Sequence, residues 1–191
     1  MLRTAGLLLL LACSGTTEDT GKSSGEGAGT SGNDGSDGTD LGCFADPASV
    51  EVGTGDSDFE VIESGAAITM VHGPQGGWHM LGSVRTHNMS EIVRVHFTVT
   101  HDESGVVVAD NTYNVATIYD EAACVGVYPG MYGYLDVREL ATGERDSPAE
   151  LMAYDTVSFC MTVTDEDARV AEACLDVTAT PDPSDLDDVP E

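Results

Sequence analysis

The histidines of this chain are concentrated in one segment and are interleaved with methionines. All five histidines lie between residues 72 and 101, and Met70, Met80 and Met89 fall in or beside the same segment. Imidazole together with thioether ligands suits Cu(I), and imidazole also suits zinc. Copper or zinc binding is therefore one hypothesis for this chain. The five histidines are His72, His79, His87, His96 and His101.

Strand geometry limits which of these side chains can share one ion. His79 and His87 would lie on the same strand face about 26 Å apart, at about 3.3 Å per residue, so no single ion can bind both. If residues 73–77 form a hairpin loop, we expect His72 and His79 to come opposite one another, with Met70 or Met80 near. The metal hypothesis therefore rests on His72 and His79, with one thioether from Met70 or Met80.

The same hairpin holds a loop dense in glycine and proline, followed by the only tryptophan of the chain. In one interpretation it is a recognition loop whose backbone amides and aromatic face contact a ligand. In the other, Gly76 and Gly77 supply positive φ angles for a tight connection and Trp78 fills the core. The shared parity of Trp78, Met80 and Val84 favours the second interpretation. The candidate ligand residues are Gly73, Pro74, Gln75, Gly76, Gly77 and Trp78.

Carboxylates gather at positions where strands are expected to end. The clusters are residues 102–103, 120–121 and 165–167. If such loops converge at one end of the domain, their oxygens could hold calcium, which would make the chain a calcium-stabilised adhesion module. Solvated turn residues are the simpler interpretation.

The overall charge narrows the range of partners. The chain has 7 Lys and Arg against 34 Asp and Glu, a formal net charge of −27. Nucleic-acid binding is excluded, because binding to phosphates needs clustered basic side chains. No histidine is paired with a nucleophile in a known motif, and no phosphate-binding glycine loop is present. We therefore expect a protein that is not an enzyme, has no cofactor, and binds an unidentified protein or glycan partner.

Residues 43–180 alternate between apolar and polar side chains, without a sustained helical period. Short runs rich in Val, Thr, Tyr and Ile, separated by Gly, Asp and Asn, predict an all-β domain of the sandwich or barrel type. The acidic tail, 181–191, contains proline and is expected to be frayed. The predicted strands are 48–52, 66–72, 78–87, 92–100, 106–110, 114–118, 132–140, 156–164 and 170–178.

The last predicted hairpin suggests how the cysteines pair. Folding it about Asp167 sets Cys160 opposite Cys174 on the polar face, and opposed positions of this kind approach disulfide geometry. This preference leaves Cys43 to pair with Cys124, which would fix the start of the domain. Four cysteines allow three connectivities, so the pairing is an expectation.

The first twelve residues predict a secreted protein. Arg3 is followed by an apolar run that includes five leucines, Leu7 to Leu11, and this run is too short to span a bilayer. The sequence Leu10-Leu11-Ala12-Cys13 resembles the lipobox of bacterial lipoproteins, which implies that Cys13 is lipidated and becomes the mature N-terminus. Ser14 in place of Asp favours the outer membrane within that family. We expect residues 1–12 to be a signal peptide. We also expect the lipid on Cys13 to anchor the protein in a membrane.

Residues 13–42 are expected to form a flexible tether after the lipidated cysteine. Beyond Cys13, they are almost wholly Gly, Ser, Thr, Asp and Glu, a composition that cannot bury a core. Assigning Cys13 to lipid also leaves an even number of cysteines for an oxidising compartment. The sequence thus predicts a cell-envelope surface lipoprotein with a non-catalytic binding or structural domain.

Two further stretches resemble known families. Residues 157–177, with Ala168 where such turns usually have glycine, resemble the closing strand pair of bacterial Ig-like and PKD-type domains. This resemblance implies an Ig-like antiparallel β-sandwich. Residues 51–80, above all His72-Gly73-Pro74-Gln75-Gly76-Gly77-Trp78-His79, resemble uncharacterised lipoproteins of myxobacteria and their relatives. That second resemblance implies no activity.

Overall fold

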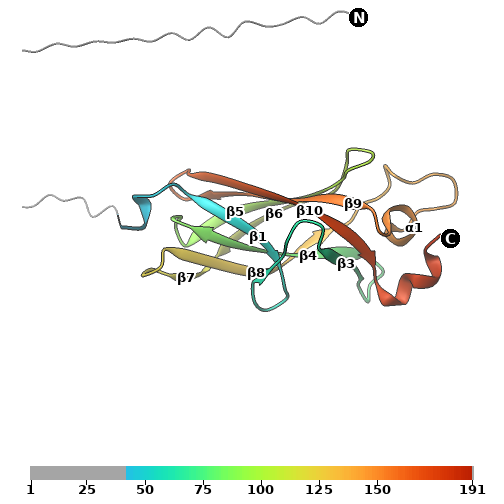
Figure 1. Cartoon of the computed structure of the whole chain (residues 1–191), viewed down its shortest axis with the longest axis horizontal. Helices are drawn as coiled ribbons and strands as arrows, with labels where there is room; N and C mark the ends of the chain where they lie inside the picture. The colour runs from blue at the N-terminus through green and yellow to red at the C-terminus, as the bar shows by residue number, and fades with distance from the viewer. Residues whose placement is uncertain (1–41, 191) are drawn as a thin grey trace, which may run out of the picture. The chain divides into compact units, whose positions relative to one another are not determined.

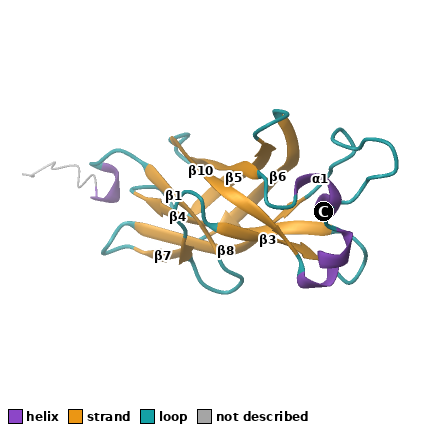
Figure 2. Cartoon of the chain, turned by 45° about the vertical axis from the view of Figure 1, so that its right-hand side comes forward, coloured by secondary structure: helices purple, strands orange, loops and turns teal. Residues whose placement is uncertain are grey.

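The computed structural model describes residues 42–190, and these residues form the predicted all-β domain (Figures 1 and 2). The predicted signal peptide, Cys13 and all but the last residue of the predicted tether lie outside the described residues. The strands are β1 (Ser49–Thr54), β2 (Glu60–Val61), β3 (Ala67–His72), β4 (Trp78–His87), β5 (Ile92–His101), β6 (Val106–Ala116), β7 (Ile118–Asp120), β8 (Val125–Tyr134), β9 (Thr156–Asp165) and β10 (Val170–Pro181). The helices are η1 (Gly42–Phe44), α1 (Pro148–Met152) and η2 (Pro183–Asp188).

The strands form a β-sandwich, as predicted. One layer has the order β2-β1-β4-β8-β7 and the other has the order β10-β9-β5-β6. Strand β3 joins the layers, because its first four residues pair parallel with β10 and its last two residues, Val71 and His72, pair antiparallel with β4. The remaining strand pairs are antiparallel. The two layers therefore make one curled, continuous sheet around a core.

Hydrogen bonds link the edge of β6 to the edge of β8, although these two strands belong to different layers. The Tyr113 hydroxyl donates to the Tyr132 carbonyl at 2.5 Å, and the Tyr134 amide donates to Asn111 Oδ1 at 3.0 Å. Just past β8, the Asp136 amide donates to the Val108 carbonyl at 2.7 Å. Exposed strand edges invite pairing with other chains, and these contacts occupy groups that such pairing would use.

Alternation along the strands builds the core. On β9, Val157, Phe159, Met161 and Val163 are all fully buried, and Phe159 meets Phe97 of β5 edge to face at 4.8 Å between ring centroids. The Phe97 ring lies directly on the backbone of the facing layer. A Cβ added at Gly82 or Gly133 would come within 2.9 or 2.8 Å of it, respectively. Glycine at these two positions leaves room for the ring.

Both predicted disulfides are present. Cys160 of β9 and Cys174 of β10 are direct ladder partners and are bonded, which confirms the register predicted for this hairpin. Cys43 is bonded to Cys124, at a sequence separation of 81 residues. The second bond fixes the segment that enters β1 to the turn between β7 and β8.

Three sequence predictions are corrected. A strand was expected at 132–140, but β8 ends at Tyr134 and the chain then runs through a loop to α1, where Ser147 and Glu150 form a capping box. The two strands expected at 106–110 and 114–118 are instead the single strand β6. The tail was expected to be frayed, but Pro183–Asp188 is an ordered 3-10 helix capped by Asp182, and Asp185 is only 4% exposed.

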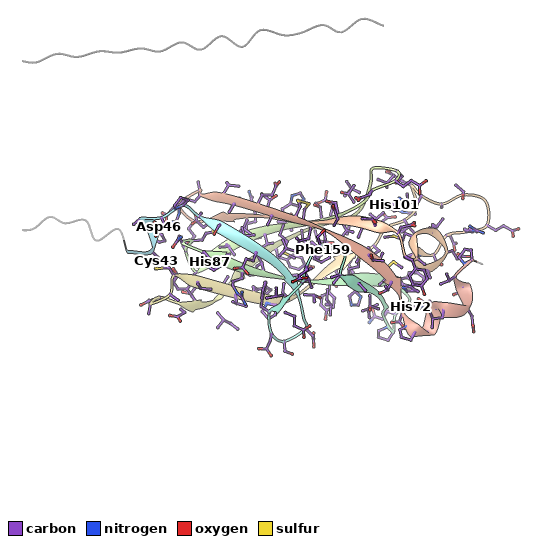
Figure 3. The ribbon with its side chains drawn as sticks, viewed as in Figure 1. Cys43, Asp46, His72, His87, His101 and Phe159 are labelled. Atoms are coloured by element: carbon purple, nitrogen blue, oxygen red, sulfur yellow. A yellow bond between two sulfur atoms is a disulfide. The ribbon has the colours of Figure 1, made fainter. Side chains whose placement is uncertain are left out.

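The two ends of the domain carry different features. Figure 3 shows Cys43, Asp46 and His87 at one end, and His72 and His101 at the other. The helices α1 and η2 lie at the second end (Figure 1). Within the described residues, no helix has the length and apolar character needed to cross a membrane.

Candidate functional site

The structure does not bring the predicted metal ligands together. The ladder pairs His72 with Trp78 and Val71 with His79, so His72 and His79 point to opposite faces of the sheet. The prediction that His72 and His79 lie opposite one another was wrong. A loop spanning 73–77 pairs residue 72 with residue 78, and residue 79, one position further along the strand, points to the other face of the sheet. Met70 and Met80, the expected thioether ligands, are 1% and 0% exposed in the core.

Four of the five histidines instead each contact one carboxylate, and these four carboxylates lie in different parts of the sequence. The pairs are His72–Asp185 at 2.8 Å, His87–Glu51 at 2.7 Å, His96–Asp110 at 2.7 Å and His101–Asp155 at 3.1 Å. Across residues 42–190 there is no group of three or more His, Cys, Asp or Glu side chains placed to hold a metal ion.

The carboxylate clusters proposed for calcium do not converge at one end. Strand β5 pairs Val93 with Asp165 and His101 with Val157, so residues 102–103 and 165–167 lie at opposite ends of it. Asp165 is buried and accepts the backbone amides of Asp167 and Arg169, which organises the β9–β10 turn. Asp120 likewise accepts the amides of the two residues that follow Glu121. These carboxylates act locally as turn-forming groups.

His101 is the centre of a hydrogen-bonded group that the sequence did not reveal. Its Nδ1 lies 2.9 Å from Ser104 Oγ and its Nε2 lies 3.1 Å from Asp155 Oδ2. These residue types occur in hydrolases, but His101 is only 5% exposed, and Ser104 Oγ also accepts the amide of Val106 at 3.2 Å. The group therefore closes the β5–β6 turn and ties it to the start of β9.

The C-terminal helix η2 is fastened to the β3–β4 hairpin by Asp185. This carboxylate accepts the Trp78 indole N–H at 2.7 Å and the His72 ring N–H at 2.8 Å, while His72 stacks on Trp78 at 4.3 Å between centroids. Asp182 also accepts the His72 backbone amide at 3.2 Å. Burial alone would raise the pKa of Asp185, but the hydrogen bonds from Trp78 and His72 outweigh it and lower that pKa. We call this group the C-terminal latch.

Sequence reasoning missed the C-terminal latch, and it also misplaced Trp78. The tryptophan is only half buried and donates to a surface helix, so it does not fill the core. One signal was available in the sequence, since Asp182 followed by Pro183 is a typical start of a helical turn. The residues that Asp182 and Asp185 contact lie more than 100 positions away, and no local pattern identifies them.

The loop 73–77 is held at its base by its own backbone. The Gly73 amide donates to the Gly77 carbonyl at 2.7 Å, and the Gly76 amide donates to the Gly73 carbonyl at 3.0 Å. Gly76 has a φ of +83°, so the predicted positive φ is correct there. Gly77 has no positive φ, and a Cβ added to it would meet nothing within 4 Å.

Beside this loop lies an open pocket of about 600 Å³. Its wall is formed by loop residues together with His79 of β4 and Tyr132 and Tyr134 of β8. These three side chains share the outer face of the sheet, because His79 pairs with Tyr134 and the intervening residues, Met80 and Gly133, point into the core. We call this cavity the tyrosine pocket.

The rings of the tyrosine pocket are arranged around His79. The Tyr132 and Tyr134 rings are nearly parallel, at 21° and 5.8 Å between centroids, and are 38% and 58% exposed. The His79 ring meets the Tyr132 ring edge to face at 4.6 Å. Burial lowers the pKa of His79 from its ordinary value, which favours the neutral form of the ring. The wall therefore combines aromatic surface with neutral hydrogen-bonding groups.

Comparisons with known proteins add little to this geometry. No family model and no curated protein matches the chain. Among solved structures, it is similar to the CooA pilin subunit from enterotoxigenic Escherichia coli, with 14% sequence identity and a TM-score of 0.33. That match covers 71% of this chain and 99% of the pilin chain. A likeness this distant carries no argument about function.

Proposed function

We propose that this chain is a cell-envelope surface lipoprotein whose β-sandwich is a non-catalytic binding module, and that the tyrosine pocket receives its ligand. The lipid on Cys13 and the tether 13–42 are part of this proposal and rest on the sequence. The observation that carries the binding role is the pocket itself, in which exposed aromatic rings stand beside a glycine-rich loop.

The position of the pocket supports this role. Cys124 immediately precedes β8, and the disulfide joins it to Cys43, where the tether enters the domain. Strand β4 runs from His79, at the pocket, to His87, which pairs with Val125 beside Cys124. Eight residues of strand span about 26 Å. The tyrosine pocket therefore lies at the end of the domain remote from Cys43, where the sequence places the tether.

The size and composition of the pocket are those of a recognition site. Ligand pockets commonly enclose about 300–1,000 Å³ and combine apolar or aromatic walls with a few polar groups. Tyrosine is well suited to such surfaces, because it offers a large, rigid contact area with a polar tip at low entropic cost. Binding residues are also found disproportionately on loops held by a rigid scaffold, as loop 73–77 is held by β3 and β4.

Two measurements test the two halves of the proposal. Mass spectrometry of the mature protein should find acyl chains on an N-terminal Cys13, and an unmodified Cys13 would refute the anchor. For the pocket, the full chain with isotope-labelled tyrosine rings is titrated with polysaccharide and peptide fractions from bacterial surfaces. Ring signals of Tyr132 and Tyr134 should shift, while those of Tyr154, which at 58% is as exposed as Tyr134, stay fixed. The binding role is refuted if no fraction moves the pocket signals.

A further inference from the structure

The aromatic surface of the tyrosine pocket is laid out for a flat, partly apolar ligand. Tyr132 and Tyr134 hold nearly parallel rings on the outer face, supported from the side by His79. Aromatic rings attract weakly polarised C–H groups through their negative faces. A pyranose ring has one face made largely of C–H groups, with its hydroxyls at the rim. Such a ring can lie on a tyrosine face while its hydroxyls reach polar groups at the pocket wall.

The pocket wall offers those polar groups without a full charge. Gln75 contributes a side-chain amide, the two tyrosines contribute hydroxyls, and His79 contributes a neutral imidazole. Within the described residues, the backbone amides of Gln75 and Gly77 donate no hydrogen bond, and both residues are exposed. These amides are therefore donors available to a ligand. Neutral donors and acceptors around an aromatic wall match the many hydroxyls of a sugar.

The charge distribution argues against the two charged classes of ligand. An anionic ligand would approach a chain of net charge −27 against repulsion. A cationic ligand would be held best by carboxylates, and none lines the tyrosine pocket. The carboxylates of Asp110, Asp136 and Glu139 line a separate depression that shares only Tyr134 with it. The neutral lining thus favours a neutral ligand.

Gly77 provides an independent indication that the pocket is kept open. Its φ is not in the left-handed region, and a Cβ at this position would clash with nothing. Neither the backbone nor the packing requires glycine there, yet residue 77 forms part of the pocket wall. A larger side chain would occupy space at this wall that the glycine leaves empty.

From these observations we infer that the tyrosine pocket binds a neutral saccharide, with a sugar ring on the tyrosine faces and its hydroxyls on Gln75 and the loop amides. This inference rests on the proposed binding function and names its ligand class. It assigns Tyr132 and Tyr134 as the stacking residues and Gly77 as the residue that leaves room for the sugar.

The test uses the full chain on an array of neutral, sulfated and sialylated oligosaccharides, together with spermine and a lysine-rich peptide as cationic probes. Saturation-transfer NMR then locates the bound probe. We expect at least one neutral oligosaccharide to bind, with transfer from the tyrosine rings to its C–H protons. Tyr132→Ala should weaken this binding about tenfold, whereas Tyr132→Phe keeps the ring and most of the affinity. Gly77→Leu should weaken it by a similar factor or more.

Matched variants and distinct outcomes separate this inference from the proposed function. Tyr154→Ala removes a ring outside the pocket that is more exposed than Tyr132, and it should leave binding unchanged. Binding of only charged probes at Tyr132 and Tyr134 would overturn the saccharide inference and leave the binding function standing. If no probe contacts the pocket rings, both are overturned. Neutral binding that Gly77→Leu and Tyr132→Ala leave intact would place the sugar elsewhere and would also overturn the inference.

Discussion

The C-terminal latch should make a measurable contribution to stability, which Asp185→Ala tests. In the folded protein Asp185 is 4% exposed and accepts hydrogen bonds from Trp78 at 2.7 Å and His72 at 2.8 Å. Its replacement by alanine removes both bonds and leaves the indole N–H without its acceptor. The expected result is a lower free energy of unfolding, with η2 released from the β3–β4 hairpin.

The magnitude follows from the two bonds and their exposure. A hydrogen bond to a charged group contributes about 1.5–3 kcal/mol to stability. The His72 side chain is 31% exposed, and Trp78 is half buried, so water can replace part of each lost interaction. We therefore expect Asp185→Ala to cost about 2 kcal/mol, which is less than the roughly 3–6 kcal/mol that two fully protected bonds of this kind would contribute. In a chain of this size, that loss lowers the Tm by about 6 °C.

Chemical denaturation and the emission of Trp78, the only tryptophan, together measure the effect. Asp187→Ala is the matched control, because it removes the same charge from an exposed residue of η2 whose side chain makes no hydrogen bond to another described residue. Only Asp185→Ala should shift both the midpoint and the emission of the folded state. Equal effects of the two variants, within about 0.5 kcal/mol, would show that the latch reasoning is wrong.

The pH dependence gives this prediction a sign. The hydrogen bonds lower the pKa of Asp185 in the folded state below its ordinary value of 3.8. A carboxyl with a lowered folded pKa binds fewer protons when folded, so its stabilising contribution is present above pH 3.8 and is lost as the pH falls through the folded pKa. The stability difference between the natural chain and Asp185→Ala should therefore shrink below pH 3.8. A difference that grows as the pH falls below 3.8 would contradict this account.

Three other substitutions test the fold. Ala168 has a φ of +60° in the β9–β10 turn, so Ala168→Gly should raise the free energy of unfolding by about 1 kcal/mol, and no gain would argue against strain there. Gly82→Ala places a methyl group 2.9 Å from Phe97 and should cost about 2 kcal/mol in denaturant unfolding; an unchanged midpoint would mean that the core yields easily. Replacing Cys43 and Cys124 by serine removes a bond that closes a long loop in the unfolded chain, at a sequence separation of 81, and should lower the free energy of unfolding by about 4 kcal/mol. An unchanged free energy of unfolding would mean that contacts other than the disulfide hold the segment that enters β1.

The parts of the fold that local patterns determine could be predicted from the sequence. The β9–β10 hairpin is the clearest case, because strict alternation and a short acidic turn fix its register and place Cys160 opposite Cys174. Within this turn, Ala168 has a φ of +60°, in the left-handed region that glycine adopts most easily. Where one face is buried, period-two alternation specifies pairing strongly.

The contacts that create the tyrosine pocket could not be predicted in the same way. Tyr132 and His79 are more than 50 positions apart in the sequence and meet only because β8 pairs with β4 in one particular register. The pattern around Gly126 to Gly133 obscured that strand, since glycine and proline usually mark turns. In the structure Gly133 lets the Phe97 ring approach the backbone, and Gly130, with a φ of +70°, lies inside β8 where its register against β4 shifts.

The structure assigns different roles to the two glycines of loop 73–77 that the sequence analysis treated together. Gly76 requires glycine for its φ of +83°, whereas Gly77 does not, and a Cβ at Gly77 meets open space. Gly76→Ala should therefore lower the free energy of unfolding by about 1 kcal/mol, because alanine is strained in the left-handed region. Gly77→Ala should leave it unchanged or raise it by up to about 1 kcal/mol, because alanine restricts the unfolded chain.

Thermal unfolding of the two single variants compares these effects within one loop. A loss of stability in Gly77→Ala equal to that in Gly76→Ala would mean that the fold itself needs glycine at both positions. Glycine at residue 77 would then no longer support an open pocket. If instead only Gly76→Ala loses stability, the fold does not need glycine at residue 77, and a larger side chain there would impair ligand binding rather than folding.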